Sequence, residues 1–462
     1  MDTMQQDAVQ GLKATLRGQL LQPGDAGYDE ARQIWNAMID KRPAMIVRCA
    51  DTADVRASVG FARDEGMALA VRGGGHNIAG NALCEGGLVV DMSGMRAVHI
   101  NQATRRAYVQ AGATLADFDH EAQSFGLATP LGINSTTGVA GLTLGGGFGW
   151  LSRKHGLTVD NLVGAQVVTA DGEMLHASAA EHADLFWALR GGGGNFGVVT
   201  LFEYALHPVG PQVTAGLIVF PFDQAKQVLT RYRNMVTTMR DDVSVWAVLR
   251  QAPPLPFLSA DVHGREVVVM AFFSLLAPEA VSAELDMVRG FGQPCGEHTG
   301  AMPYTAWQQA FDPLLAPGAR NYWKSHNFVT LRDEAIDTVI RYIGMLPSEQ
   351  CEIFFGLLGG AVNRHGTDAT AYPHRDAMYA MNVHTRWTDP AEDDKCIGWA
   401  RSFFADAAPY AAGGVYINFL TQEEEGRIAD AYGPNYGKLK QLKGRYDPAN
   451  LFRQNQNIRP AA

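Results

Sequence analysis

The chain has 462 residues, of which 47% are hydrophobic and 19% are charged, so we expect a folded protein of two or three domains. Its formal net charge of −10 argues against nucleic acid or an anionic membrane as the main partner. No run of eighteen apolar residues is present, and the sequence therefore predicts no transmembrane helix.

Cysteine usage and the N-terminal segment bear on the cellular compartment. Residues 1–22 are polar and lack the apolar core of a signal peptide. The cysteines have neither metal-ligand nor paired spacing: Cys49, Cys84, Cys295, Cys351 and Cys396. An odd, dispersed set is typical of a reducing cytoplasm, so we expect a cytoplasmic protein without a bound metal.

The first glycine-rich segment follows a short apolar run, residues 67–71, that predicts a buried strand. It reads Arg-Gly-Gly-Gly-His-Asn-Ile-Ala-Gly over residues 72–80. Glycines let a ligand approach backbone N–H groups closely, which suits phosphate, and His76 is placed to touch or bond to that ligand. A tight turn that ends in a surface histidine fits this segment equally well.

Short strands, hairpins and a few helices are expected between residues 43 and 208. Residues 97–100 and 107–110 predict a pair of strands. Thr114 caps a predicted helix in which Leu115, Phe118, Ala122 and Phe125 share one face, and Gly126 ends it. Asp171-Gly172, flanked by apolar pairs, predicts a hairpin.

The second glycine-rich segment, residues 138–149, is predicted to be a loop that lays its backbone against a flat or phosphorylated ligand. The alternative is a packing corner. A third run, residues 191–197, contains a formal G-x-G-x-x-G match. A helix is predicted before it and a strand after it, the reverse of the Rossmann order, so we reject a dinucleotide fingerprint there.

After Pro208 the pattern predicts an α+β fold, with one sheet covered by helices on one face. The candidate strands are residues 267–275, 352–358 and 378–387, and the candidate helices are residues 224–239 and 335–346. Phe354, Tyr379 and Trp387 could line a pocket for a planar substrate or belong to the core. Alternation along a strand puts only half of such residues on the pocket face.

Four motifs together resemble the berberine bridge enzyme group, which belongs to the vanillyl-alcohol oxidase type of FAD-linked oxidoreductases. They are residues 72–76, residues 138–149, Gly-Leu-Thr-Val-Asp-Asn at 156–161, and Tyr-Asp-Pro-Ala-Asn-Leu-Phe at 446–452. Their order is that of the family and they span most of the chain. The sequence is similar in particular to bacterial members such as the hydroxynicotine oxidases.

The resemblance implies an FAD-binding domain built from residues 1–208 and 412–462. The substrate domain, residues 209–411, would be a helix-covered antiparallel sheet. It also implies a covalent bond from His76 to the flavin 8α-methyl, with the flavin accepting hydride from the substrate. The cofactor-binding residues expected on this basis are His76, Arg72, Gly73, Gly74, Gly75, Asn77, Gly80, Asn134, Thr137, Gly138, Gly141, Gly145, Gly146, Gly149, Val198 and Asn457.

The chain departs from the family at two positions near the flavin. Many members form a second flavin bond through a cysteine that corresponds to Asn134 here, so we expect attachment through His76 alone. Family oxidases often have a small valine that admits oxygen, and Thr137 stands at that position. Oxygen is nevertheless the expected electron acceptor.

The sequence offers no obvious strong base. The family's tyrosine base ends a Tyr-x-Asn-Tyr segment, which here ends in Phe419, and another family base maps near Gly356. Hydride transfer from a neutral amine needs no base, whereas alcohol oxidation needs one. His374 and His384 are fallback candidates, although a structural or exposed histidine is the alternative for each.

Tyr416 and Asn418 are expected to point the same way from an extended segment. They could contact flavin or substrate, or they could be a pair of hydrogen-bonded structural residues. We predict an FAD-dependent oxidase that acts on a small organic amine or alcohol, with Asn418, Tyr416 and His374 as candidate catalytic residues. The alternatives are a carbohydrate or secondary-metabolite alcohol oxidase, a dehydrogenase that uses another acceptor, and a flavin-binding protein without enzymatic activity.

Overall fold

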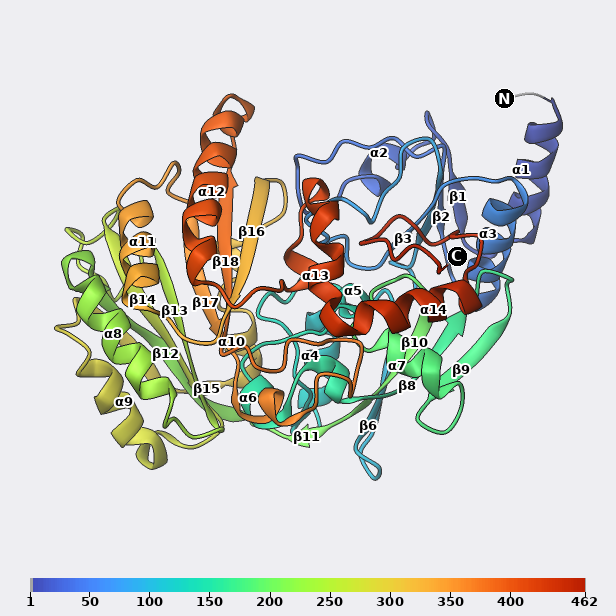
Figure 1. Ribbon diagram of the computed structural model, residues 1–462. Coiled ribbons are helices and arrows are strands. Elements are labelled where there is room, and N and C mark those ends of the chain that lie inside the picture. The colour runs from blue at the N-terminus through green and yellow to red at the C-terminus, as the bar shows by residue number, and fades with distance from the viewer. Residues whose placement is uncertain (1–2, 462) are drawn as a thin grey trace.

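The computed structural model describes residues 3–461 and has an α+β fold, as the sequence predicts. A large sheet with helices packed on it forms one part, and two smaller sheets formed by residues 19–205 lie beside it (Figure 1). None of the helices between residues 3 and 461 combines the length and apolar character needed to cross a bilayer.

A four-stranded sheet carries the first glycine-rich segment. Its order is β1 (Gln19–Leu21), β2 (Met45–Arg48), β4 (Leu88–Asp91) and β3 (Leu69–Arg72), with β4 parallel to both β2 and β3. Helix α1 (Thr3–Thr15) and helix α3 (Thr52–Asp64) pack together beside it. Because β3 ends at Arg72, the glycines that follow leave the sheet at its edge.

The second sheet has five antiparallel strands in the order β5 (Val98–Asn101), β6 (Arg106–Gln110), β10 (Val198–Ala205), β8 (Leu162–Val168) and β9 (Met174–Ser178). The predicted β5–β6 pair and the hairpin at Asp171-Gly172 are confirmed. Thr114 caps α4 (Leu115–Gln123) through a reciprocal pair of hydrogen bonds with Asp117. Phe125, placed on the buried face by the sequence pattern, lies past the end of α4 and is 41% exposed.

The large sheet has seven antiparallel strands, ordered β15 (Gly296–Pro303), β12 (Gln212–Pro221), β14 (Glu266–Ser274), β13 (Val243–Gln251), β17 (Glu352–Leu357), β18 (Tyr379–Trp387) and β16 (Arg320–Phe328). Four helices lie along the same face, as the sequence predicts (Figure 1): α8 (Ala225–Val236), α9 (Ser282–Arg289), α11 (Asp333–Ile343) and α12 (Asp393–Ala407).

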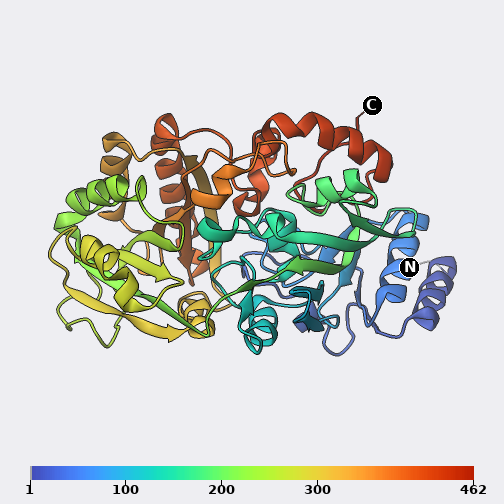
Figure 2. The same cartoon turned by 90° about the horizontal axis from the view of Figure 1, so that it is seen from below.

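The end of the chain returns to the part built by its beginning. Helices α13 (Ile428–Tyr432) and α14 (Tyr436–Tyr446) lie beside elements of the first 205 residues, and α14 packs on α7 (Ala183–Leu189) (Figures 1 and 2). Lys443 on α14 is fully buried and pairs with Asp447 at 2.6 Å. This return agrees in outline with the two-part domain expected, whose boundaries at 208 and 412 stay a prediction.

Two local predictions need correction. The segment 138–149, expected to be a loop, contains the helix α5 (Val139–Leu144), with Gly138 at its N-cap. The segment that holds Tyr416 and Asn418 is not extended, because residues 417–419 form a 3₁₀ turn. In both places a short sequence with mixed local preferences takes its shape from the surrounding packing.

Candidate active site

A cavity of about 360 Å³ lies between the helix-free face of the large sheet and the glycine-rich segments of the first 205 residues. Sequence-predicted residues that line it come from segments far apart in the chain: Gly73, Gly74, Gly75, His76, Asn77, Asn134, Thr137, Gly138, Gly141, Val198, Tyr416 and Asn418. The fold therefore brings both the first glycine-rich segment and the start of the second to one cavity.

The other predicted site residues lie outside the cavity wall: Arg72, Gly80, Gly145, Gly146, Gly149, Asn457 and His374. Several of these glycines are packing residues. A Cβ on Gly145 would lie 2.2 Å from the Asn418 side chain, and one on Gly149 would lie 2.0 Å from the Leu131 carbonyl oxygen. The packing-corner alternative thus describes the end of the second segment.

His374 is held away from the cavity by its own contacts. Its Nε2 lies 2.9 Å from the Ala431 carbonyl oxygen, and the ring packs so closely on Gly414 that a Cβ there would meet it at 2.2 Å. Burial lowers its pKa. These contacts are those of a structural histidine outside the cavity wall and not those of a catalytic residue.

The two glycine-rich segments meet backbone to backbone in the cavity wall. A Cβ on Gly74 would lie 2.3 Å from the Gly138 nitrogen, and a Cβ on Gly138 would lie 2.3 Å from the Gly74 nitrogen. No other residue type fits at either position without a backbone shift, because both obstacles are main-chain atoms. This contact fixes His76, two residues after Gly74, relative to α5.

His76 is positioned by a short chain of hydrogen bonds and by stacking. Its Nε2 lies 2.9 Å from Thr136 Oγ1, and that hydroxyl donates to Asn134 Oδ1 at 2.7 Å. The imidazole stacks on Trp35 with 5.1 Å between ring centroids. Burial lowers the pKa of His76 to about 3, so the ring is neutral at physiological pH.

Strand register decides which residues of the large sheet face the cavity. Tyr379 of β18 packs on Tyr232 of α8 with 5.9 Å between centroids, and Trp387 Nε1 donates to Asp393 of α12 at 2.8 Å. Odd-numbered residues of β18 therefore face the helices, and the even-numbered Asn382 and His384 line the cavity. Of the three aromatic residues named from the sequence, only Phe354 lines it.

A row of polar residues crosses three neighbouring strands on that face. Arg250 of β13 lies opposite Glu352 of β17, which lies opposite His384 of β18. Glu352 Oε2 accepts from Arg250 Nη1 at 2.7 Å, and Glu352 Oε1 accepts from His384 Nδ1 at 3.0 Å. All three line the cavity.

Glu352 stays ionised in this row. Burial raises the pKa of its carboxyl, but the Arg250 charge and the hydrogen bond from His384 outweigh burial, so the pKa lies below its usual range. Sequence reasoning missed Arg250 and Glu352. The available signal was a glutamate at the start of the predicted strand 352–358, which shares a face with Phe354 by alternation.

Tyr416 and Asn418 do point toward one another, through a 3.0 Å hydrogen bond from Asn418 Nδ2 to the Tyr416 hydroxyl oxygen. The same oxygen accepts from the Gly147 N–H at 3.1 Å. Burial raises the pKa of Tyr416 to about 12, so the phenol is protonated at neutral pH. Asn418 also donates to the Gly141 and Leu142 carbonyls, so the pair joins the C-terminal segment to α5.

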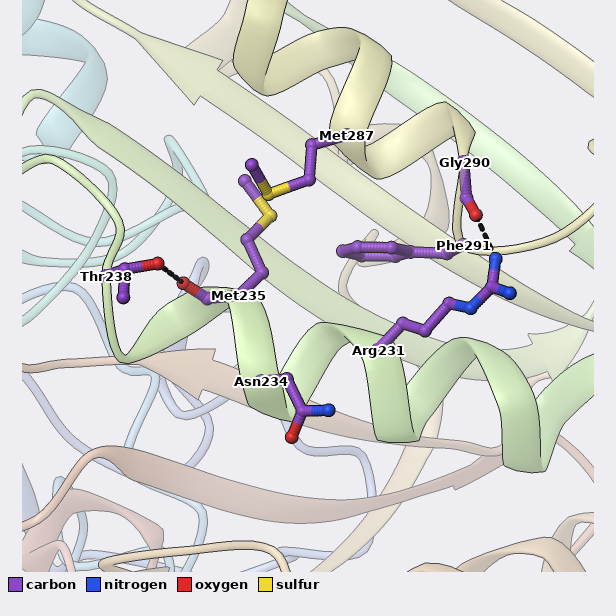
Figure 3. Close-up of a pocket in the computed structure, with 7 residues that line it drawn as sticks. All are labelled: Arg231, Asn234, Met235, Thr238, Met287, Gly290 and Phe291. Carbon is purple, nitrogen blue, oxygen red and sulfur yellow. Dashed lines mark hydrogen bonds between the residues drawn. The ribbon is translucent and has the colours of Figure 1, made fainter.

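A second pocket, of about 440 Å³, lies between α8 and the end of α9 and shares no lining residue with the cavity (Figure 3). Met235, Met287 and Phe291 form its apolar wall, and Arg231 donates to the Gly290 carbonyl at its edge. Its seven described lining residues include no carboxylate, histidine or cysteine. The chemistry-bearing groups therefore belong to the cavity that the glycine-rich segments line.

Known proteins are similar to this one over nearly the whole chain. The sequence matches the FAD binding domain family over residues 43–178 and the "Berberine and berberine like" family over residues 415–459. It is 31% identical to (R)-6-hydroxynicotine oxidase of Paenarthrobacter nicotinovorans, covering 96% of this chain and 97% of that protein. It is 30% identical to the uncharacterized FAD-linked oxidoreductase YgaK of Bacillus subtilis, covering 97% and 98%.

Among solved structures, the fold is similar to that of 6-hydroxy-D-nicotine oxidase from Arthrobacter nicotinovorans, with a TM-score of 0.86 and 29% identity. The likeness covers 96% of this chain and 98% of that one. Residues that line the cavity thus fall both in the matched N-terminal region and in the matched C-terminal region.

Proposed function

The chain belongs to the berberine bridge enzyme-like FAD-linked oxidoreductases, and we propose that it is a covalent flavoprotein oxidase, joined to FAD through His76, that acts on a small organic amine or alcohol. The position of His76 in the cavity wall, neutral and hydrogen-bonded through one ring nitrogen, is the observation that carries this proposal.

The residues that line the cavity fit FAD. Gly73, Gly74 and Gly138 line the cavity, and the close backbone contact between Gly74 and Gly138 puts two stretches of main chain side by side in its wall, which suits a flat ring or a phosphate. The C-terminal segment adds polar atoms that have no hydrogen-bond partner in residues 3–461, Asn455 Oδ1 and Gln456 Nε2. When bound, the flavin supplies a two-electron hydride acceptor.

The hydrogen bonds around His76 support a particular attachment atom. Because the Thr136 hydroxyl donates to Asn134, it accepts from His76, and the proton of the neutral ring is assigned to Nε2. Nδ1 then carries the free lone pair. We therefore propose that Nδ1 bonds to the flavin 8α-methyl.

A single attachment is proposed because Asn134 stands where a second bond would need a thiol. None of the five cysteines, all within the described residues, lines the cavity. Oxygen as the electron acceptor is supported by the oxidase activity that the hydroxynicotine oxidase's name states. A cytoplasmic location is supported by the five free thiols, four of them buried.

The test is acid precipitation of purified wild-type protein and of H76A. We expect yellow colour in the wild-type precipitate and, for H76A, dissociable flavin in the supernatant or none. H120A, which removes an exposed histidine on α4, serves as the matched control and should keep its colour. Wild-type flavin released by acid would overturn the covalent bond.

Hydrogen peroxide formed during turnover would support the oxidase, and its absence would favour a dehydrogenase.

A further inference from the structure

We propose that His384 accepts the proton of a substrate hydroxyl, that Glu352 and Arg250 position it for this role, and that the site takes a neutral alcohol with a largely apolar body. This inference rests on the proposed function and chooses between its two substrate classes. It also selects His384 from the two fallback bases, His374 and His384, that the sequence offers.

The orientation of His384 follows from strand pairing. With Glu352 directly opposite on β17, the Glu352 carboxylate accepts from His384 Nδ1 at 3.0 Å and so assigns the ring proton to Nδ1. The other ring nitrogen, Nε2, has no hydrogen-bond partner in residues 3–461. A carboxylate-oriented imidazole with a free Nε2 in a cavity wall is the arrangement that general-base catalysis requires.

The surroundings limit how the ring can move. Trp323 of β16 lies opposite His384 and meets it edge to face at 4.9 Å between centroids, and Trp35 stacks at 6.5 Å. His384 is 3% exposed. Rotamer freedom is therefore small, and the geometry set by Glu352 persists without substrate.

Charge in the cavity favours a neutral substrate. Glu352 is the only carboxylate among the described lining residues, and its two oxygens are already bonded to Arg250 and His384. An ammonium group would therefore meet no free counter-charge and would lie near the Arg250 guanidinium. A hydroxyl, in contrast, can donate to His384 Nε2, a buried acceptor that has no donor in residues 3–461.

The remaining walls favour an apolar substrate body rather than a sugar chain. Trp246, Val248 and Phe354 lie on the same face as the polar row, and Trp246 and Phe354 stack with 5.9 Å between centroids. An oligosaccharide needs a polar partner for each buried hydroxyl. Beyond the polar row, the sheet face offers Asn382, whose two amide atoms have no partner in residues 3–461, as a second hydrogen-bonding group.

The atoms and electrons of the step balance. The O–H bond breaks, its proton moves to His384 Nε2, and its electron pair forms the second bond of the carbonyl. The carbinol C–H bond breaks and its pair leaves as hydride to the flavin that the FAD-linked activity supplies. The imidazolium formed is stabilised by Glu352 until the proton passes to solvent, and the product is an aldehyde or ketone.

The experiment compares flavin-loaded wild type with H384Q and E352Q. Flavin bleaching is followed anaerobically with aromatic primary and secondary alcohols and with matched amines, from pH 5 to pH 9. We expect H384Q to lower the limiting bleaching rate with alcohols by about 100-fold or more, with half-saturation changed less than about threefold. E352Q should lower the rate by about tenfold. H326Q, a buried histidine of β16 outside the cavity, is the matched control and should leave the rate unchanged.

A second readout does not depend on turnover. NMR of protein labelled with ¹⁵N-histidine should show His384 as the Nδ1–H tautomer, and E352Q should remove that preference. An Nε2–H tautomer, an H384Q variant that bleaches at the wild-type rate, or bleaching by amines alone would each overturn the inference while leaving a flavin oxidase in place. Failure of the proposed function gives a different result, because the wild-type protein then holds no flavin. In that case the NMR tautomer of His384 alone tests the inference.

Discussion

Thr136 Oγ1 lies 2.9 Å from His76 Nε2 and donates to Asn134 Oδ1 at 2.7 Å, so Asn134 orients the hydroxyl that holds the histidine ring. We expect T136V to slow covalent flavin attachment by about tenfold, because one hydrogen bond that fixes the tautomer is lost. The measurement is the covalent fraction against time after FAD is added to apoprotein. T136S keeps the hydroxyl and should behave as wild type; equal rates in all three would exclude the tautomer argument.

The glycines of the cavity wall should separate into packing and ligand positions. G74A places a methyl 2.3 Å from the Gly138 nitrogen, and we expect it to cost about 3 kcal/mol and to lower both the melting temperature and the flavin content.

G141A adds a methyl in open space on α5, in the cavity, so it should fold normally yet bind less flavin. G60A on α3 also meets nothing within 4 Å and should stabilise by about 0.5–1 kcal/mol. Normal flavin content in G141A would show that this part of the cavity does not hold the flavin.

The buried pair Lys443–Asp447 holds the C-terminal segment in the cavity wall. Lys443 Nζ also donates to the Asn195 and Phe452 carbonyls, at 2.8 and 2.9 Å, just before residues 454–456 reach the cavity. We expect K443M to cost about 3–5 kcal/mol and to reduce flavin retention, because buried Asp447 loses its cationic partner and keeps only the backbone N–H donors of Leu451 and Phe452. Thermal melting and the absorbance ratio of flavin to protein give the readout. K440M, a half-buried lysine on the same helix, should change neither; if K443M matches it, the pair has no role in the site.

Asp119 on α4 should make stability fall as pH rises. Burial raises the pKa of its carboxyl from the usual 3.8 to about 7, against a single hydrogen bond from Gln308 at 3.1 Å. The unfolded chain releases this proton near pH 4 while the folded chain keeps it to about pH 7. The free energy of unfolding therefore falls between pH 4 and pH 7 and levels off above pH 7. The total loss is on the order of 4 kcal/mol.

D119N should remove that penalty. Its melting temperature relative to wild type should rise from pH 4 to pH 7 and then stay constant, measured at matched ionic strength. The exposed His120 on the same helix gives the control H120A, whose difference from wild type should not follow this profile. A pH-independent difference for D119N would show that Asp119 is already ionised in the folded protein.

Local signals were sufficient wherever a few adjacent residues determine the backbone. Thr114 with Asp117 caps α4, and Asp171-Gly172 turns β8 into β9, because these interactions span three or four positions. The segment 138–149 was harder, since its glycines disfavour a helix that the packing of α5 nevertheless stabilises. Likewise, Tyr416 and Asn418 converge through a 3₁₀ turn that their spacing does not specify.

The sequence by itself determined the α+β class, the alternation that puts Phe354 and Glu352 on one face, and the four motifs that indicate the family. Only the tertiary structure decided which histidine serves the cavity. Nothing in the sequence favoured His384 over His374. In the structure His374 bonds to the Ala431 carbonyl, whereas His384 bonds to Glu352. Arg250, Glu352 and His384 lie up to 134 positions apart, and their contact depends on the register of three strands, which no local pattern encodes.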